Sequence, residues 1–237
     1  GGAAAAPRDD GQPYPFFLAH ALQAAPATLG PVQDWQLEWK YDGIRAQLVK
    51  RGGQCWVWSR GEELVGDRFP EVLAAAAPLP GGTVLDGEIL VWRDGAPQPE
   101  VFALLQRRIG RKTLSKKILA EAPAAFVAYD LLEAEGADLR GEPQHVRRVR
   151  LESLLASTGL RCSPLLAAPD WDAAAALRAG ARERGVEGLM LKHRDARYGS
   201  GRTKSDGVWW KWKVDPLAVD AVLVYAQAGH GRRAHRA

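Results

Sequence analysis

The sequence predicts an α+β fold, built mostly from antiparallel β-sheets that are flanked by helices. Segments in which apolar and polar residues alternate cluster in the first quarter of the chain and return near its end. Helix-like segments lie between them, without the regular strand–helix–strand alternation of a doubly wound fold. The chain has 237 residues, of which 46% are hydrophobic and 25% charged, so it can bury the core of one catalytic domain.

The first part of the chain is predicted to form a short helix and then a meander. Residues 1–13 are small, polar and proline-containing, which is typical of a linker, and residues 14–27 carry apolar side chains at helical spacing. Three alternating segments follow, at residues 35–40, 44–51 and 54–59. We expect these three segments to form an antiparallel meander that brings Lys40, Arg45 and Arg60 close together.

Helices and strands mix irregularly through the rest of the chain. Helices are expected at residues 69–77, 99–109, 113–120, 144–157 and 170–184. Strands are expected at residues 83–86, 88–93, 124–131, 188–192, 208–214 and 219–227. No internal repeat is visible.

The positive charge is concentrated in two runs. The net charge is only +4, but residues 107–117 carry six lysines and arginines without an acid, and residues 192–213 carry seven against Asp195 and Asp206. Basic clusters on one surface are typical of nucleic-acid binding. A solvated helix face gives the same pattern, so each run has both interpretations.

The two cysteines, Cys55 and Cys162, have neither metal-ligand spacing nor a disulfide framework, and Cys55 is expected to be buried or half-buried. No segment approaches the roughly 20 apolar residues of a membrane span, and no signal peptide is recognisable. We therefore expect a reducing, cytoplasmic setting and no binding to a membrane. A monomer is also expected.

The sequence KYDGIR at residues 40–45 is the first cluster that indicates chemistry. A charged lysine cannot attack phosphorus, but burial beside other cations lowers the pKa of a lysine and makes it a covalent nucleophile. Gly43 permits a close backbone approach, and Arg45 offers a fork for a phosphate or ribose. A solvated lysine at a strand end, followed by an Asp-Gly turn, is the alternative interpretation of Lys40.

Five more clusters follow in order along the chain. They are SRG at 59–61, LDGE at 85–88, FVAYD at 126–130, EGLMLK at 187–192 and WWKWK at 209–213. Together with KYDGIR, these motifs resemble those of the covalent nucleotidyltransferases, and most closely those of the ATP-dependent DNA ligases. The resemblance covers residues 14–216 and implies the nucleotidyltransferase, or ATP-grasp-like ligase, fold of an adenylation domain.

The resemblance also implies a reaction, with ATP and Mg²⁺ as cofactors and nicked duplex DNA as the partner. Lys40 attacks the α-phosphorus of ATP, releases pyrophosphate and becomes a lysyl-AMP. The AMP then passes to the 5′-phosphate of a nick, and the 3′-hydroxyl displaces it as the strand is sealed.

Two glutamates and three lysines supply the charges that such a reaction needs. Glu88 and Glu187 are oxygen donors beside glycines, and Mg²⁺ takes one or two carboxylates together with phosphate and water. Lys211 and Lys213 are two apart on a predicted strand and face the same side, and with Lys192 they suit a triphosphate. Two plainer interpretations remain: Asp86-Gly87 as a hairpin turn, and the lysines as guards of an exposed sheet edge.

The remaining roles come from the resemblance alone. It implies that Glu38 receives the adenine amino group and that Tyr129 stacks on adenine, where phenylalanine is more usual in the family. It implies ribose or metal contacts for Glu88 and Glu187. It implies phosphate contacts for Arg45, Arg60, Arg202, Lys211 and Lys213. Asp130, which follows Tyr129, has two open roles: support of a neighbouring strand, or metal binding.

Residues 217–237 are expected to begin a truncated OB-fold domain, because 218–226 alternates like a first strand and an OB-fold has five. On that interpretation the chain is a fragment whose self-adenylation is weak. The alternatives are an mRNA capping guanylyltransferase or RNA ligase, which share the KxDGxR pattern, and a catalytically impaired DNA-binding fragment. Glu38 and the WWKWK motif favour a DNA ligase.

Overall fold

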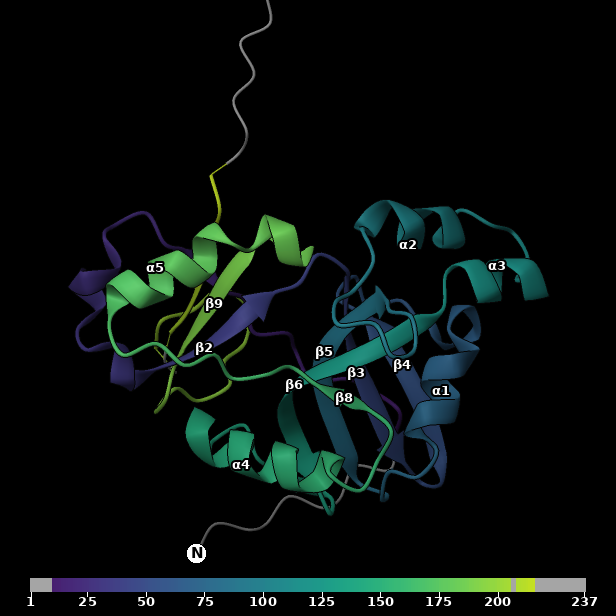
Figure 1. Cartoon of the computed structure of the whole chain (residues 1–237). Coiled ribbons are helices and arrows are strands. Elements are labelled where there is room, and N and C mark those ends of the chain that lie inside the picture. The colour runs from purple at the N-terminus through teal and green to yellow at the C-terminus, as the bar shows by residue number, and fades with distance from the viewer. Residues whose placement is uncertain (1–9, 206–207, 216–237) are drawn as a thin grey trace, which may run out of the picture.

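The protein folds into two β-sheets that face each other, with helices on their outer sides, as the α+β prediction requires (Figure 1). A computed structural model describes residues 10–205 and 208–215. Its strands are β1 (His20–Ala21), β2 (Trp35–Lys40), β3 (Ile44–Arg51), β4 (Gln54–Ser59), β5 (Thr83–Val91), β6 (Ala124–Ala134), β7 (Ala137–Asp138), β8 (Arg161–Cys162), β9 (Gly188–His193) and β10 (Trp209–Lys213). Its α-helices are α1 (Pro70–Ala76), α2 (Phe102–Ile109), α3 (Lys116–Glu121), α4 (Gln144–Leu155) and α5 (Trp171–Ala179).

The smaller sheet has four strands in the order β1-β10-β9-β2. The three long strands run antiparallel, and β1 joins the edge in parallel. Their register places Gly188 opposite both Lys40 and Lys213, and Lys192 opposite Trp209. The sequence motifs at residues 40, 187–192 and 209–213 therefore lie on neighbouring strands.

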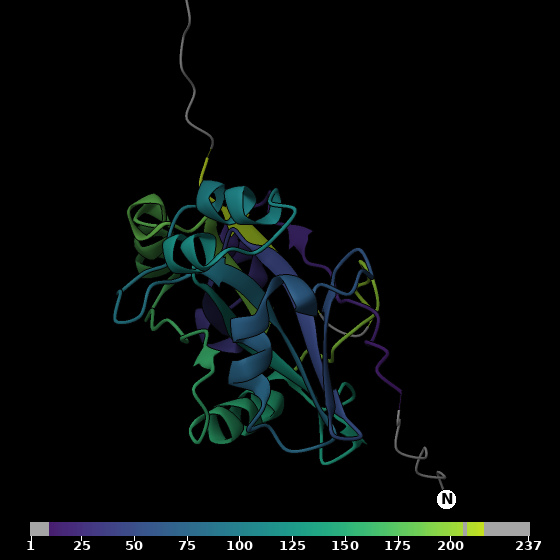
Figure 2. The ribbon, with the colours of Figure 1, turned by 90° about the vertical axis from the view of Figure 1, so that its right-hand side faces the viewer.

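The larger sheet has six strands: β4-β3-β5-β6-β7 form its path and β8 pairs with β6. Its antiparallel register sets Arg45 opposite Glu88 and Asp86 opposite Asp130. Helices α1 to α4 pack apolar residues against one face of this sheet, with α1 in front of the strands in the turned view (Figure 2). Helix α5 packs instead against the small sheet.

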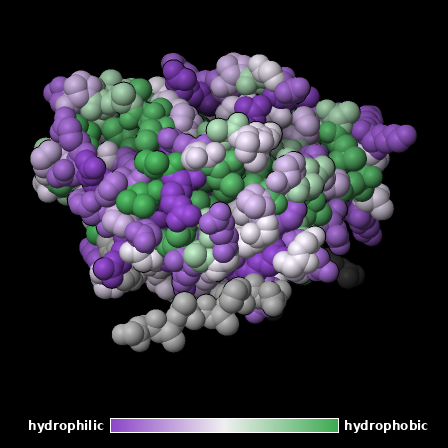
Figure 3. Space-filling model, turned by 90° about the horizontal axis from the view of Figure 1, so that it is seen from below, coloured by the Kyte–Doolittle hydropathy of each residue, from purple (hydrophilic) through white to green (hydrophobic). Residues whose placement is uncertain are grey.

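A third apolar cluster joins the two sheets. It combines Tyr14, Phe17 and Tyr198 with Val84 of the large sheet and Trp209 of the small one. The surface seen from the α4 side mixes hydrophilic and hydrophobic side chains over short distances (Figure 3). None of the helices in the described part of the chain has the length and apolarity that a membrane crossing requires.

The helix expected within residues 14–27 is wrong, because this segment is extended and lies along the edge of the small sheet. The Leu18 amide donates to the Gly201 carbonyl at 2.9 Å, and the Leu22 amide donates to the Lys211 carbonyl at 3.0 Å. Prolines at 13 and 15 also disfavour helical backbone at the residues before them. Only residues 26–29 form a short 3₁₀ turn.

The meander is also wrong, although its three strands have the expected bounds. Strand β2 pairs with β9 in the small sheet, whereas β3 and β4 belong to the large one. The chain crosses between the sheets at Tyr41-Asp42-Gly43, where a Cβ on Gly43 would lie 2.3 Å from the Ile89 carbonyl oxygen. A cleft lies beside this crossing, and Lys40, Arg45 and Arg60 all line it. These three residues are therefore close together, as expected, although their strands do not form one meander.

The hairpin interpretation of Asp86-Gly87 is wrong as well. Residues 83–91 form one strand whose pairing with β6 shifts between Val84 and Leu85 and again between Asp86 and Gly87. A Cβ on Gly87 would lie 2.4 Å from the Val127 carbonyl oxygen, so the irregular strand needs glycine here. The other predicted helices and strands are confirmed with shifted ends, and the strand expected at 219–227 lies outside the described residues.

Candidate active site

A cleft of about 480 Å³ lies between the two sheets where the chain crosses from β2 to β3. It is lined by every predicted site residue except Lys213: Glu38, Lys40, Arg45, Arg60, Glu88, Tyr129, Glu187, Arg202 and Lys211. Lys213 is exposed at the end of β10 and does not line the cleft. The structure thus gathers residues from both sheets around one cavity, and it leaves one predicted member outside.

Lys40 ends β2 and is paired with Glu187, which comes just before β9. The Lys40 Nζ lies 2.5 Å from the Glu187 Oε2, and the two side chains are 20% and 30% exposed. The Glu187 amide donates to the Lys40 carbonyl at 2.8 Å, so the backbone fixes this pairing. Burial, followed by the charge of Glu187, raises the pKa of the neighbouring Asp42. Lys40 is therefore a half-buried amine with a carboxylate acceptor already in contact.

The charged end of the cleft, as we call it, consists of three cations next to Lys40: Arg60, Arg202 and Lys211. Burial, followed by the charges of Arg202, Lys40, Lys213 and Arg60, lowers the pKa of Lys211. Mutual repulsion of this kind indicates positive charge without enough carboxylates to balance it. Such a site favours a polyanion. Lys213 adds to the field from outside the cleft.

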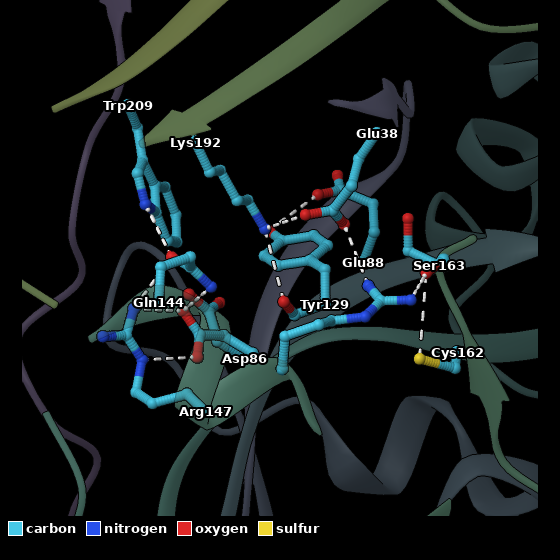
Figure 4. Close-up of polar contacts among 12 residues, drawn as sticks. Glu38, Asp86, Glu88, Tyr129, Gln144, Arg147, Cys162, Ser163, Lys192 and Trp209 are labelled. Carbon is cyan, nitrogen blue, oxygen red and sulfur yellow. Dashed lines mark hydrogen bonds and ion pairs between the residues drawn. The ribbon is translucent and has the colours of Figure 1, made fainter. Parts of the chain in front are cut away.

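At the opposite side, Glu38, Tyr129 and Lys192 form what we call the buried end of the cleft (Figure 4). The Lys192 Nζ lies 2.8 Å from the Glu38 Oε2 and 4.4 Å from the centre of the Tyr129 ring. It also donates to the Tyr129 carbonyl at 3.3 Å. Glu38 and Lys192 are each 1% exposed, so this pair is almost dry. Lys192 thus lines the same cleft as Lys211, as the motif order predicted, and its contacts there are with Glu38 and Tyr129.

Arg45 is held by a buried acid. It donates two hydrogen bonds to Asp86, at 3.2 and 2.7 Å, and the Tyr198 hydroxyl donates to the same carboxylate at 2.7 Å. Burial acts to lower the pKa of the Arg45 guanidinium, but Asp86, Tyr129 and Tyr198 together raise it well above its ordinary value. The guanidinium lies 5.2 Å from the Phe16 ring, so its position is fixed before any ligand binds.

Glu88 faces the cleft between the two ends. It is half-buried and accepts a hydrogen bond from the Tyr129 hydroxyl at 3.3 Å. Burial raises the pKa of Glu88 to about 8, although Arg45 and Lys40 act in the opposite direction. The described residues contain no cluster of three or more His, Cys, Asp or Glu side chains that could hold a metal. Two carboxylates, Glu88 and Glu187, do line the cleft, which fits an ion that takes most of its ligands from phosphate and water.

The structure decides between the two roles left open for Asp130. Its side chain is fully buried and binds Arg147 of α4 at 2.8 and 3.0 Å. Gln144 accepts from both Arg147 at 2.8 Å and the indole nitrogen of Trp209 at 2.9 Å (Figure 4). Asp130 therefore supports the wall of the cleft and does not line it.

Several residues that shape the site were missed by the sequence analysis: Asp86, Gln144, Arg147, Arg148 and Tyr198. Four of these are polar residues without a motif of their own, and the amphipathic pattern of residues 144–157 gives no sign that two of its arginines are buried. Asp86 was visible, but its interpretation as a turn hid its role. A charged residue can be buried only where an oppositely charged or polar partner lies beside it. That partner is far away in the sequence, so a local pattern does not reveal it.

The two basic runs are only partly available at the surface. Arg108 is 1% exposed and forms a close ion pair with Glu71, and Lys192 is buried as described. Arg107 and Lys117, at 61% and 84% exposed, lie on the surface of α2 and α3. The first run thus leaves a solvated basic surface, while part of the second lines the cleft.

Comparison with known proteins gives one consistent result. The family model described as "ATP dependent DNA ligase domain" matches residues 16–213. A probable DNA ligase of Opitutus terrae is 36% identical over 253 residues, which cover 94% of this chain and 24% of that protein. A DNA ligase of Haloferax volcanii is 37% identical over 226 residues, covering 94% of this chain and 38% of that protein. The chain thus spans less than half the length of these relatives.

Solved structures agree with the sequence relatives. The ligase domain of LigD from M. tuberculosis has a TM-score of 0.64 and 28% identity over 84% of this chain and 60% of that chain. A mycobacterial DNA ligase D complexed with ATP and MES has the same TM-score and coverage, at 30% identity.

Proposed function

This chain belongs to the ATP-dependent DNA ligase domain family, and on that premise we propose that it transfers AMP from ATP to Lys40 and then to a nicked DNA strand. One observation carries the proposal: a half-buried lysine with a carboxylate 2.5 Å away stands between a cluster of cations and a buried carboxylate. This arrangement matches a nucleotide, which has a polyanion at one end and a base at the other.

The first step needs a neutral amine and an aligned α-phosphorus. Glu187 is the acceptor in contact with the Lys40 Nζ, so it takes the proton as the amine attacks. The new N–P bond forms while the bond from the α-phosphorus to the bridging oxygen breaks, and pyrophosphate leaves with that electron pair. Arg60, Arg202 and Lys211 offset the negative charge that develops.

Mg²⁺ fits the carboxylates that line the cleft, and it is part of the proposal. Glu88 and Glu187 both line the cleft, and a magnesium ion needs only one or two such ligands when phosphates supply the rest. Bound there, the ion would neutralise phosphate charge. The Tyr129 hydroxyl would meanwhile keep Glu88 oriented.

The buried end supplies base recognition in this proposal. Tyr129 presents its ring to the cleft, where adenine stacks, and Glu38 accepts the exocyclic amine of adenine. Guanine presents a carbonyl at that edge, which a carboxylate repels. Glu38 therefore supports use of ATP over GTP, and so a ligase over the capping guanylyltransferase alternative.

The proposal is tested by incubating the protein with ATP labelled at the α-phosphate and separating it on a denaturing gel. We expect a labelled protein band, no band from γ-labelled ATP, and little or no band from α-labelled GTP. Equal labelling by ATP and GTP would favour the capping-type alternative. No band at any ATP or Mg²⁺ concentration would contradict self-adenylation.

The DNA partner and the later steps need a second assay. With a duplex that carries a nick whose 5′-phosphate is already adenylated, we expect strand sealing that weakens steeply as salt rises, since phosphate contacts release counterions. Sealing is expected to be confined to nicked duplexes. The adenylation domain at 14–216, the monomeric state and the cytoplasmic location remain predictions.

A further inference from the structure

A second cation approaches Glu38 from the side away from the cleft. The Arg148 Nη1 of α4 lies 3.7 Å from the Glu38 Oε1. The Lys192 Nζ lies 2.8 Å from the other oxygen, the Glu38 Oε2 (Figure 4). Arg148 is 4% exposed, so this contact is as dry as the one with Lys192. The carboxylate is thus enclosed by two positive charges.

Arg148 is anchored independently of the cleft. Its Nε donates to the Glu152 Oε1 at 2.7 Å, and its Nη2 donates to the Ser163 carbonyl at 2.5 Å. Arg148 does not line the cleft. It lines a separate, shallow pocket together with Glu152 and Cys162. A ligand in the cleft therefore leaves the guanidinium in place.

The hydrogen bonds around Glu38 are incomplete. Among the described residues, neither oxygen of Glu38 accepts a hydrogen bond of good geometry, and the Arg148 Nη1 donates none. Buried polar atoms without partners are uncommon and cost free energy. The nearby cations stabilise the negative charge of Glu38. The oxygens of Glu38 remain available to accept a hydrogen bond from a ligand in the cleft.

We infer that Arg148 is a positioning residue for base selection: it holds the Glu38 carboxylate so that Glu38 accepts the exocyclic amine of adenine. The inference rests on the proposed function and adds a residue to it. The Lys192 Nζ contacts the Tyr129 carbonyl and the Tyr129 ring as well as Glu38, so several contacts set the position of Lys192. Arg148 acts on Glu38 from behind, and it affects a ligand only through the carboxylate.

The test compares ATP with purine riboside triphosphate, which lacks the 6-amino group, in binding to the whole chain. Binding is measured by calorimetry in EDTA, so that no covalent step intervenes. For wild type we expect ATP to bind at least about tenfold more tightly than the analogue, the lower end of the effect of one hydrogen bond to a charged group. For Arg148→Met we expect the affinity for ATP to fall by most of that factor while the affinity for the analogue stays within about twofold.

Two further variants make the test specific. Arg150→Met changes an exposed arginine of the same helix and is expected to leave both affinities unchanged. Arg148→Lys keeps the charge and should show a selectivity between those of wild type and Arg148→Met, which also serves if the methionine variant does not fold. An equal loss for ATP and the analogue, or unchanged selectivity in the folded variants, would overturn the inference.

The outcome separates this inference from the proposed function. A wild-type protein that binds ATP selectively but forms no labelled adduct contradicts lysyl adenylation and leaves the role of Arg148 standing. A wild-type protein that does not discriminate ATP from the analogue overturns the role of Arg148 and leaves adenylation standing. A wild-type protein that binds neither nucleotide in EDTA and forms no labelled adduct in the presence of Mg²⁺ overturns both.

Discussion

The two ends of the cleft hold their charges in opposite ways. At the buried end each charge has a counter-charge: Lys192 lies 2.8 Å from Glu38, and behind the wall Arg147 binds Asp130 at 2.8 Å. At the charged end the cations outnumber their partners, and the pKa of Lys211 is lowered by burial and by its basic neighbours. Lys40, with Glu187 at 2.5 Å, stands between these two arrangements.

Under the proposed function, this difference explains how one cavity both selects and attracts a nucleotide. Paired, dry charges are fixed in place, so they discriminate between ligands by the position of hydrogen-bonding groups. Unbalanced cations attract any polyanion, and their effect falls as salt rises. We therefore expect substitutions at the buried end to change selectivity or folding, and substitutions at the charged end to change affinity in a salt-dependent way.

The largest expected effect comes from the residue that joins the two ends. Lys40→Ala should abolish the covalent AMP adduct, because it removes the amine that lines the cleft beside Glu187. Thermal unfolding should remain cooperative, since Lys40 is 20% exposed and its pair with Glu187 is partly solvated. The measurement is labelling with α-labelled ATP, with the melting curve as the control for folding. An adduct of undiminished yield on the variant would assign the nucleophile elsewhere.

The next effect distinguishes a fully buried ion pair from an exposed one. Asp130→Asn should lower the free energy of unfolding by about 3–5 kcal/mol, because Arg147 would be left as a buried charge without its counter-charge. Glu100→Gln breaks the exposed pair with Arg93 and should cost at most about 1 kcal/mol. Urea denaturation of both variants gives the two values. Equal costs would mean that the support behind the buried end is dispensable.

A smaller effect is expected at the charged end. Lys211→Ala should weaken ATP binding about tenfold at low salt, because Lys211 lines the cleft, while Lys213→Ala should change it by about twofold, because Lys213 is exposed outside it. The unliganded Lys211→Ala protein should be no less stable than wild type, since the substitution relieves repulsion among crowded cations. Titrations at two salt concentrations check both statements. If Lys213→Ala has the larger effect, the polyanion binds outside the cleft.

The smallest expected effect concerns Glu88, which lies between the ends. Its pKa in the folded protein is about 8, above the ordinary value of 4.5, so between these pH values the folded protein keeps a proton that the unfolded chain has released. The stability that this proton contributes is complete below about pH 4.5 and is lost as pH rises through 8. From pH 5 to pH 8, wild type should therefore lose stability relative to Glu88→Gln. Because Glu88 is only half-buried and solvent screens its charge, the loss is on the order of 1 kcal/mol, below the value for a fully buried carboxyl.

Urea denaturation in EDTA at several pH values measures this difference. Glu63→Gln, at an exposed glutamate, provides the control and should run parallel to wild type at every pH. A difference between wild type and Glu88→Gln that is constant with pH would mean that Glu88 is ionised in the free protein, like an exposed carboxylate.

Patterns in the sequence were enough to predict the class of fold, the strands at 35–40, 44–51 and 54–59, and most of the residues that line the cleft. These follow from short-range signals: alternation of apolar residues, glycines at turns and crossings, and motifs in a fixed order. The packing of α4 on the large sheet was not visible in that way, although its helical pattern was.

The neighbours of each strand and the partners of each buried charge depend on the tertiary fold. Strands β2 and β3 are separated by only three residues, yet they belong to different sheets. Lys40 forms its ion pair with Glu187, which is 147 positions away in the sequence. A local pattern records how a side chain faces its own helix or strand, whereas a buried charge is tolerated only when a distant chain segment brings the opposite charge to it. For that reason Arg147 and Arg148 read as surface residues in the sequence and lie behind the cleft in the fold.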